Sequence, residues 1–178
     1  MRIHCLLLLL CSLGVSLAAK PNVVFFFIDD MGWTDLGFMG SKYYESPHID
    51  KLAQEGMVFM NAYAAAPNCA PSRACLMSGQ YSPRHGVYTV ANSDRGSSKD
   101  RKLIPIKNTI HLAEEFVTMG EALQAGGYVT ATMGKWHLGD DPTTQGFDVN
   151  VAGKTWGSPS GGGYHSPYKY PNLEQKEK

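Results

Sequence analysis

The apolar positions of the chain fall into short runs that alternate between two kinds of pattern. Residues 22–28 (NVVFFFI) are a continuous apolar run that ends at two aspartates, which is typical of a strand buried on both faces of a parallel sheet. Residues 47–55 (PHIDKLAQE) have helical spacing, with Ser46 as the expected N-cap and Gly56 as the end. The remaining pattern predicts strands over 57–63 and 128–133, helices over 71–78 and 118–125, and an exposed polar loop over 94–102. This alternation predicts an α/β fold with a largely parallel sheet.

The first residues have the pattern of a targeting segment. Arg2 precedes the apolar run 5–15, and small residues follow it up to Ala18, so we expect a secretory signal peptide over residues 1–18. The run is too short to cross about 30 Å of hydrocarbon, which argues against a stable membrane anchor. A lipoprotein site at Cys11 is the alternative, but Leu10 before it is bulky. The sequence therefore predicts a secreted or periplasmic protein.

Composition narrows the class of protein. The 178 residues include 16 Lys plus Arg and 16 Asp plus Glu, and this balance argues against a nucleic-acid partner, which calls for a basic excess. Four cysteines are too few for a disulfide scaffold. The length corresponds to one domain or part of one.

Three polar groupings follow or precede the predicted elements, where an open α/β sheet places its site. The first is the pair Asp29 and Asp30, whose hard oxygens suit calcium or magnesium. The alternative is that the pair caps a turn. The second grouping, residues 69–73 (CAPSR), opens a predicted helix, and the third, residues 134–137 (GKWH), follows a predicted strand.

The second and third groupings each carry a candidate reactive group. Cys69 at a helix start, near Arg73, is expected to have thiolate character. The alternatives are a disulfide with Cys75 or two buried thiols. In extended backbone Lys135 and His137 share one side, where they are suited to bind an anionic oxygen and move a proton. The alternative is a surface lysine beside a structural histidine, the role also expected of the isolated His85 and His165.

In this order the three groupings resemble the sulfatase family. The resemblance covers about residues 21–150, and it rests on 69–73 (CAPSR), 127–139 (GYVTATMGKWHLG), 22–37 (NVVFFFIDDMGWTDLG) and 46–53 (SPHIDKLA). It implies an α/β fold of the alkaline-phosphatase-like sandwich type, with a mainly parallel central sheet that is incomplete in this chain. It also implies hydrolysis of sulfate esters.

The family's chemistry implies a modified cysteine. Within the motif Cys69, Pro71, Ser72 and Arg73, a formylglycine-generating enzyme would oxidise Cys69 to formylglycine, an aldehyde. One hydroxyl of the hydrated aldehyde would attack the sulfur and displace the alcohol, and the other would expel sulfate.

The resemblance also implies roles for the neighbouring side chains. Asp29, Asp30 and the modified Cys69 would bind calcium, with magnesium as a possibility. Arg73 would orient the hydrate and stabilise its charge, and Lys135 would bridge the hydrate and a sulfate oxygen. His137 would be the base for the second hydroxyl.

Other features of the family pattern are missing from this sequence. The family carries a second Asp-Asn pair further along the chain, and no such dipeptide follows His137. We therefore expect residues 19–178 to be the truncated N-terminal part of a sulfatase catalytic domain, inactive by itself. A phosphoester or phosphonate hydrolase and an inactive secreted fragment are the alternatives.

The substrate expected from the resemblance is a sulfated glycan, or else a sulfated small molecule. Tyr164, Tyr168 and Tyr170 are candidates to line a sugar site. We expect them instead to be loop residues that pack on another part of the protein.

Overall fold

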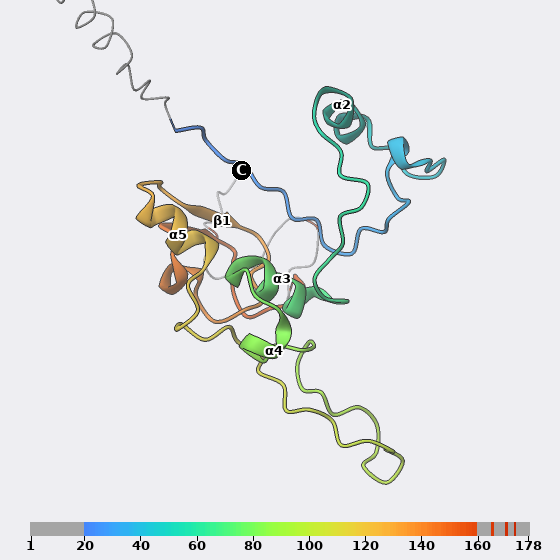
Figure 1. Cartoon of the computed structure of the whole chain (residues 1–178), viewed down its shortest axis with the longest axis vertical. Helices are drawn as coiled ribbons and strands as arrows, with labels where there is room; N and C mark the ends of the chain where they lie inside the picture. Colours follow the sequence, from blue (N-terminus) through green and yellow to red (C-terminus); the bar gives the residue numbers. More distant parts are fainter. Residues whose placement is uncertain (1–19, 160–164, 166–169, 171–172, 174–178) are drawn as a thin grey trace, which may run out of the picture.

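A computed structural model describes residues 20–159 together with residues 165, 170 and 173. The predicted signal peptide, Tyr164 and Tyr168 lie outside the described residues. Along the chain the elements are η1 (Gly37–Met39), α2 (Pro47–Glu55), α3 (Cys69–Ser78), α4 (Ser82–His85), α5 (Met119–Ala125), β1 (Ala131–Met133), η2 (Pro142–Gln145) and β2 (Val149–Val151). Figure 1 shows α3, α4 and α5 on one body, with α2 and η1 set apart from it.

The described sheet is a parallel pair. β1 pairs with β2, and Ala131 lies opposite Val149 in the register. Just before the pair, Thr130 donates its backbone N–H to the Asp148 carboxylate at 2.7 Å. The strand predicted over 128–133 is therefore confirmed only for its last three residues.

Two predicted strands are wrong for the described chain. Residues 22–28 form no strand, and residues 57–63 form turns and irregular backbone. A strand is defined by its ladder, and neither segment pairs with another described segment. Their side chains are exposed as a result, including Val24, Phe26 and Phe59.

The predicted helices are confirmed, with one difference at a cap. α2 follows Ser46 and ends at Gly56 as expected, but the Ser46 side chain does not cap it. Its hydroxyl accepts from the Gly37 N–H at 2.8 Å and donates to Asp50 at 2.9 Å. Ser46 thereby ties η1 to α2 instead of satisfying the first helical turn.

The other two predicted helices have clear boundaries. α3 begins at Cys69, two residues before the predicted start, and ends at Gly79 in the left-handed conformation that favours glycine. α5 follows Thr118 with a complete capping box, in which Thr118 and Glu121 each satisfy the other's backbone N–H. The loop over 94–102 is irregular and mostly exposed, as predicted.

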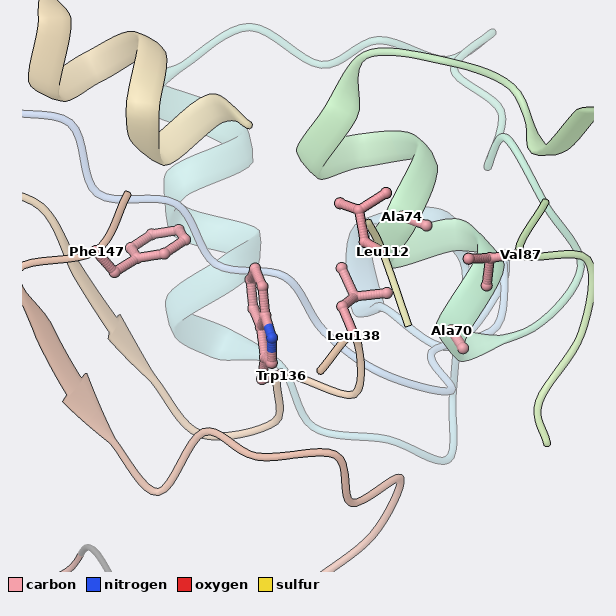
Figure 2. Packing of buried hydrophobic residues seen from close by; sticks show 7 residues of the cluster. All are labelled: Ala70, Ala74, Val87, Leu112, Trp136, Leu138 and Phe147. Atoms are coloured by element: carbon pink, nitrogen blue, oxygen red, sulfur yellow. The ribbon is translucent and has the colours of Figure 1, made fainter. Parts of the chain in front are cut away.

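The core lies between α3 and the segment around Trp136. Figure 2 shows its seven side chains, which are Ala70, Ala74, Val87, Leu112, Trp136, Leu138 and Phe147. Trp136 is 1% exposed and meets Phe147 edge to face, with ring centroids 5.6 Å apart. This packing fixes the chain on either side of Trp136, where two of the predicted site residues lie. None of the described helices has the length and apolar character needed to cross a membrane.

Candidate active site

Three predicted site residues from distant parts of the sequence meet at one carboxylate. The Asp29 Oδ2 atom lies 2.6 Å from Lys135 Nζ and 3.2 Å from Arg73 Nη2. Arg73 also donates from Nη1 to the Lys135 carbonyl at 2.5 Å. We call Asp29, Arg73 and Lys135 the charged cluster. The structure thus joins one member of each of the three polar groupings.

Arg73 is the most enclosed member of the charged cluster. It lies one turn into α3 and is only 6% exposed. Its guanidinium lies 5.0 Å from the centroid of the Phe27 ring, in cation–π contact. A planar fork with two bonded nitrogens and one stacked face has little freedom to rotate. Arg73 is therefore preorganised to present a fixed positive charge.

The charges of the cluster hold Asp29 ionised. Burial by itself raises the pKa of the Asp29 carboxyl, but hydrogen bonds and positive charge from Lys135 and then Arg73 outweigh burial and lower it. At neutral pH the cluster holds one carboxylate and two cations. The cluster's net charge is positive, but Asp30 lines the same cavity and brings the formal charge of its lining side chains to zero. An anion there would be bound by Arg73 and Lys135 directly and not by a net positive cavity.

His137 lies beside this cluster in a tightly held backbone. Its φ is +64°, in the left-handed region, and its N–H donates to the Lys154 carbonyl at 2.8 Å. Burial lowers the pKa of His137, the positive charges of Lys135 and Arg73 lower it further, and Asp29 partly opposes them. His137 is thereby favoured in its neutral form, the form that accepts a proton.

The backbone at His137 corrects the simple alternation expected from the sequence. Extended backbone would place Lys135 and His137 on one side and Trp136 on the other. Instead, Lys135 and Trp136 both line the main cavity, and the left-handed turn at His137 sends its ring toward Gly157. The two polar residues still lie close enough for their charges to interact.

Both cysteines of the described chain are free thiols, so the expected disulfide alternative is wrong. Cys75 is buried, with its Sγ 3.4 Å from His85 Nε2. Cys69 is half-buried at the first position of α3. Because residues four apart share a helix face, Cys69 lies on the same side of α3 as Arg73. Cys69 is not among the residues that line either cavity of the described chain.

The other members of the predicted modification motif sit inside α3. Pro71 is buried in its first turn, and Ser72 is half-buried, with its backbone N–H bonded to the Asn68 carbonyl. The motif is therefore helical in this structure, and its residues are buried or half-buried.

Asp29 and Asp30 lie between two hollows. A cavity of about 590 Å³ is lined by both aspartates together with Arg73 and Lys135. An open hollow of about 610 Å³ lies on the α2 side of the same two aspartates. The first cavity contains the whole charged cluster, so it is the candidate active site.

The donor type at this site fits a hard cation. Asp29 commits Oδ2 to Lys135 and Arg73, while the Asp30 carboxylate makes no hydrogen bond to any described residue. No group of three His, Cys, Asp or Glu side chains with metal-site geometry occurs within the described part of the chain. Two carboxylates supply fewer oxygens than the 6–8 that calcium takes, so they fit as part of a calcium site.

Sequence reasoning missed two neighbours of the site. Phe27, which we assigned to a buried strand, stacks on Arg73. Gly157 packs on His137, since a Cβ built at Gly157 would lie 2.5 Å from His137 Cε1. No signal in the sequence distinguishes Phe27 from Phe25 and Phe26, and Gly157 is one glycine in a glycine-rich stretch.

The sequence that carries these site residues matches a known protein family. A family model described as "Sulfatase" matches residues 21–178. The chain therefore belongs to the sulfatase family.

Curated relatives agree with this assignment. A "Sulfatase" from Formosa agariphila is 44% identical over 146 residues, which are 75% of this chain and 26% of the relative. The N-acetylgalactosamine-6-sulfatase of Mus musculus is 40% identical over 151 residues, covering 80% of this chain and 28% of the relative. Arylsulfatase G of Rattus norvegicus is 40% identical over 140 residues, covering 76% and 24%. The chain thus spans about a quarter of the length of the curated relatives it matches.

Solved structures give the same result for the fold. "Crystal structure of Ps i-CgsB" matches with a TM-score of 0.59 and 37% identity, over 72% of this chain and 27% of that one. A Bacteroides thetaiotaomicron structure titled for glycosaminoglycan metabolism and labelled BT33336S-sulf matches with a TM-score of 0.60 and 33% identity, over 74% and 28%. Together with the parallel pair, these matches confirm the α/β, alkaline-phosphatase-like fold class, present in part.

Proposed function

We propose that this protein hydrolyses sulfate esters at the cavity that holds the charged cluster. The observation that carries the proposal is the meeting of Asp29, Arg73 and Lys135 at one carboxylate, with neutral-favoured His137 beside them. Two fixed cations over a shared carboxylate suit a tetrahedral dianion or its ester. Membership of the sulfatase family supports sulfate as that anion.

The nucleophile we propose is residue 69 after conversion of its thiol to formylglycine. In that form it would supply a hydrated aldehyde, whose two hydroxyls serve attack and release. The conversion needs a formylglycine-generating enzyme as a partner. Support comes from the helix position of Cys69, on the Arg73 side of α3, and from the motif residues Pro71 and Ser72 that follow it.

Each remaining side chain has a role that its contacts support. Arg73 is buried and twice bonded, so it stabilises negative charge without having to reorganise. Lys135 carries a compact charge on a flexible stem and binds a sulfate oxygen. His137, whose pKa burial lowers, accepts the proton that must leave residue 69.

A calcium ion, or magnesium, would be held by Asp29 and Asp30 with the side chain of residue 69, and further ligands would complete its shell. When bound, it would supply positive charge to polarise the sulfate oxygens. Asp29 would then share its carboxylate between the ion and Lys135, while Arg73 keeps that carboxylate in place.

A sulfated glycan is the substrate class we propose. The relatives include proteins named N-acetylgalactosamine-6-sulfatase, and a crystal structure of Ps i-CgsB was obtained in complex with a neocarrahexaose. That complex matches this chain with a TM-score of 0.55 and 36% identity, over 67% of this chain and 25% of that one. Export through a signal peptide over residues 1–18 would bring the protein to extracellular or periplasmic glycans.

The experiment compares aryl sulfate with aryl phosphate turnover by the protein made from its complete gene, alongside a converting enzyme and with calcium present. We expect sulfate release to exceed phosphate release and to disappear in Cys69→Ala. Preferential phosphate release would favour the phosphoester hydrolase instead. Sulfate release that survives Cys69→Ala would overturn the proposal.

A further inference from the structure

One wall of the active-site cavity is aromatic and plays no part in holding an anion. Trp156 and Tyr170 line the same cavity as the charged cluster. Their ring centroids are 6.1 Å apart and their planes are tilted by 32°. We call this pair the aromatic wall. Of the three tyrosines named as candidates for a sugar site, Tyr170 is the one that the structure describes, and it lines this cavity.

A cation accompanies the aromatic wall. Lys154 Nζ lies 5.9 Å from the centroid of the Trp156 ring. Lys154 is not among the residues that line the cavity, and its positive charge also contributes to lowering the pKa of the Asp141 carboxyl. The cavity thus presents two cations on one part and an aromatic surface on another, and the Lys154 ammonium lies close to the Trp156 ring.

We propose that the aromatic wall is a sugar subsite, which takes the pyranose ring that carries the sulfate, while Lys154 pairs with a second anionic group of the same glycan. This inference rests on the proposed function. A sugar ring has a face of C–H bonds whose hydrogens are attracted to the negative face of an aromatic ring. The cavity of about 590 Å³ lies within the size range of ligand sites of about 300–1,000 Å³ and is far larger than one sulfate group needs.

The second charge is what favours a glycan over a simple aryl sulfate. A phenolic ring would stack on the aromatic wall equally well, but it carries no group for Lys154. A polyanionic glycan offers a further sulfate or a carboxylate on the same or the next ring. An ammonium beside an aromatic face recognises that combination.

Backbone contacts also fix the position of Trp156 relative to His137, the proposed base. The Lys154 carbonyl accepts the His137 N–H at 2.8 Å, and the Gly157 backbone packs directly on the His137 imidazole. Trp156 lies between these two attachment points. A ring seated on Trp156 is therefore positioned by the same short segment that positions His137.

The test measures binding in the full-length protein carrying Cys69→Ala, so that no ligand is turned over. Calorimetric titrations with calcium present use inorganic sulfate and sulfated disaccharides prepared from chondroitin sulfate, heparin and carrageenan. We expect at least one disaccharide to bind more tightly than inorganic sulfate. Adding Trp156→Ala should weaken that disaccharide about tenfold or more, the order found when an aromatic that stacks on a nucleic-acid base is removed, and leave inorganic sulfate affinity unchanged. Trp156→Phe should restore most of the loss.

Two further variants sharpen the result. Lys154→Gln should weaken only disaccharides that carry a second anionic group. Trp33→Ala, which removes an exposed tryptophan that lines neither cavity, should change nothing. Disaccharide affinity that is unmoved by Trp156→Ala, or an equal loss for inorganic sulfate, would overturn the subsite. If every disaccharide binds no better than inorganic sulfate, the subsite is wrong even where the protein hydrolyses aryl sulfates. Failure to hydrolyse any sulfate ester is a separate result, which counts against the proposed function.

Discussion

The Asp29 carboxylate links two cationic side chains, with Oδ2 at 2.6 Å from Lys135 Nζ and 3.2 Å from Arg73 Nη2. Asp29 is itself 30% exposed at the side chain, whereas Arg73 is 8% and Lys135 20%. The partly open carboxylate therefore holds two more enclosed cations at one place. Removing its charge should release the Lys135 ammonium, and it should leave Arg73 held by the Lys135 carbonyl and the Phe27 ring.

Asp29→Asn tests this arrangement. The amide keeps the shape of the side chain but loses the charge that holds Lys135 and Arg73, so we expect aryl sulfate turnover to fall by roughly 10²-fold, the order for removing one group of a preorganised electrostatic site. Steady-state kinetics measures the loss. Asp35→Asn is the matched control, because Asp35 accepts only a local bond from the Gly32 N–H that an amide oxygen can also accept. Equal losses in the two variants would contradict the role of Asp29.

Arg73→Lys keeps the charge and removes the fork. A lysine cannot bond the Lys135 carbonyl and Asp29 together while stacking on Phe27. We expect kcat to fall by about 10²-fold with the far-ultraviolet circular dichroism spectrum unchanged. Arg84→Lys, at an exposed position, should leave kcat unchanged. Turnover within a few-fold of wild type in Arg73→Lys would show that any positive charge suffices there.

The helices and the site motifs were predictable from sequence because their signals are local. Ser46 and Gly56 bracket α2, Thr118 starts α5, and a helix beginning near Cys69 was expected. Of the predicted strands only β1, within residues 128–133, is found in the described chain. A run such as residues 22–28 becomes a strand only through pairing with a distant segment. In the described chain it pairs with none.

The site was predictable as a set of residues but not as a geometry. Asp29 was expected to bind calcium, and Arg73 and Lys135 were expected to hold the hydrate and the sulfate. Nothing in the sequence shows that Asp29 pairs with both cations. The left-handed backbone of His137 was also invisible, since a histidine with positive φ carries no local signature. Gly157 acquires its meaning only when the fold sets it against that imidazole.

The pH dependence of activity should follow the protonation of His137. Burial and neighbouring positive charge lower its pKa below the ordinary value, so its neutral, proton-accepting form persists below about pH 6.5. We expect the acid limb of the kcat/KM profile to have its midpoint below that value. In His137→Asn turnover should fall by about 10²–10⁴-fold and the limb should vanish.

The exposed His111 supplies the control for this profile, because the charges of Lys135, Arg73 and Asp29 act on His137 and His111→Asn leaves that histidine in place. Its profile should match wild type. An acid limb that stays in place in His137→Asn would assign the limb to another group and contradict the role of His137 as base.

A second histidine should control stability rather than activity. His85 is buried, its Nδ1 accepts from the Val87 N–H at 3.1 Å, and its Nε2 faces Cys75 Sγ. Burial lowers its pKa, so the unfolded chain binds a proton at higher pH than the folded chain does. The stabilising contribution of neutral His85 should therefore be complete above about pH 6.5. Below that pH the free energy of unfolding should fall.

Urea denaturation across this pH range measures the effect. His85→Gln should be less stable than wild type at about pH 7.5 and should show a smaller loss on acidification, because one titrating group is gone. His48→Gln, at an exposed position in α2, should keep the wild-type slope. A wild-type slope in His85→Gln would show that other groups cause the acid sensitivity.

The most direct test of the account follows residue 69 itself. The protein is produced with a converting enzyme at several expression levels, the fraction of residue 69 present as aldehyde is measured by mass spectrometry of its tryptic peptide, and aryl sulfate turnover is measured on the same samples. We predict that turnover rises in proportion to the aldehyde at residue 69, that Cys75 stays a thiol, and that Cys69→Ser shows no multiple turnover. Undiminished turnover in samples whose residue 69 is entirely thiol would contradict the account.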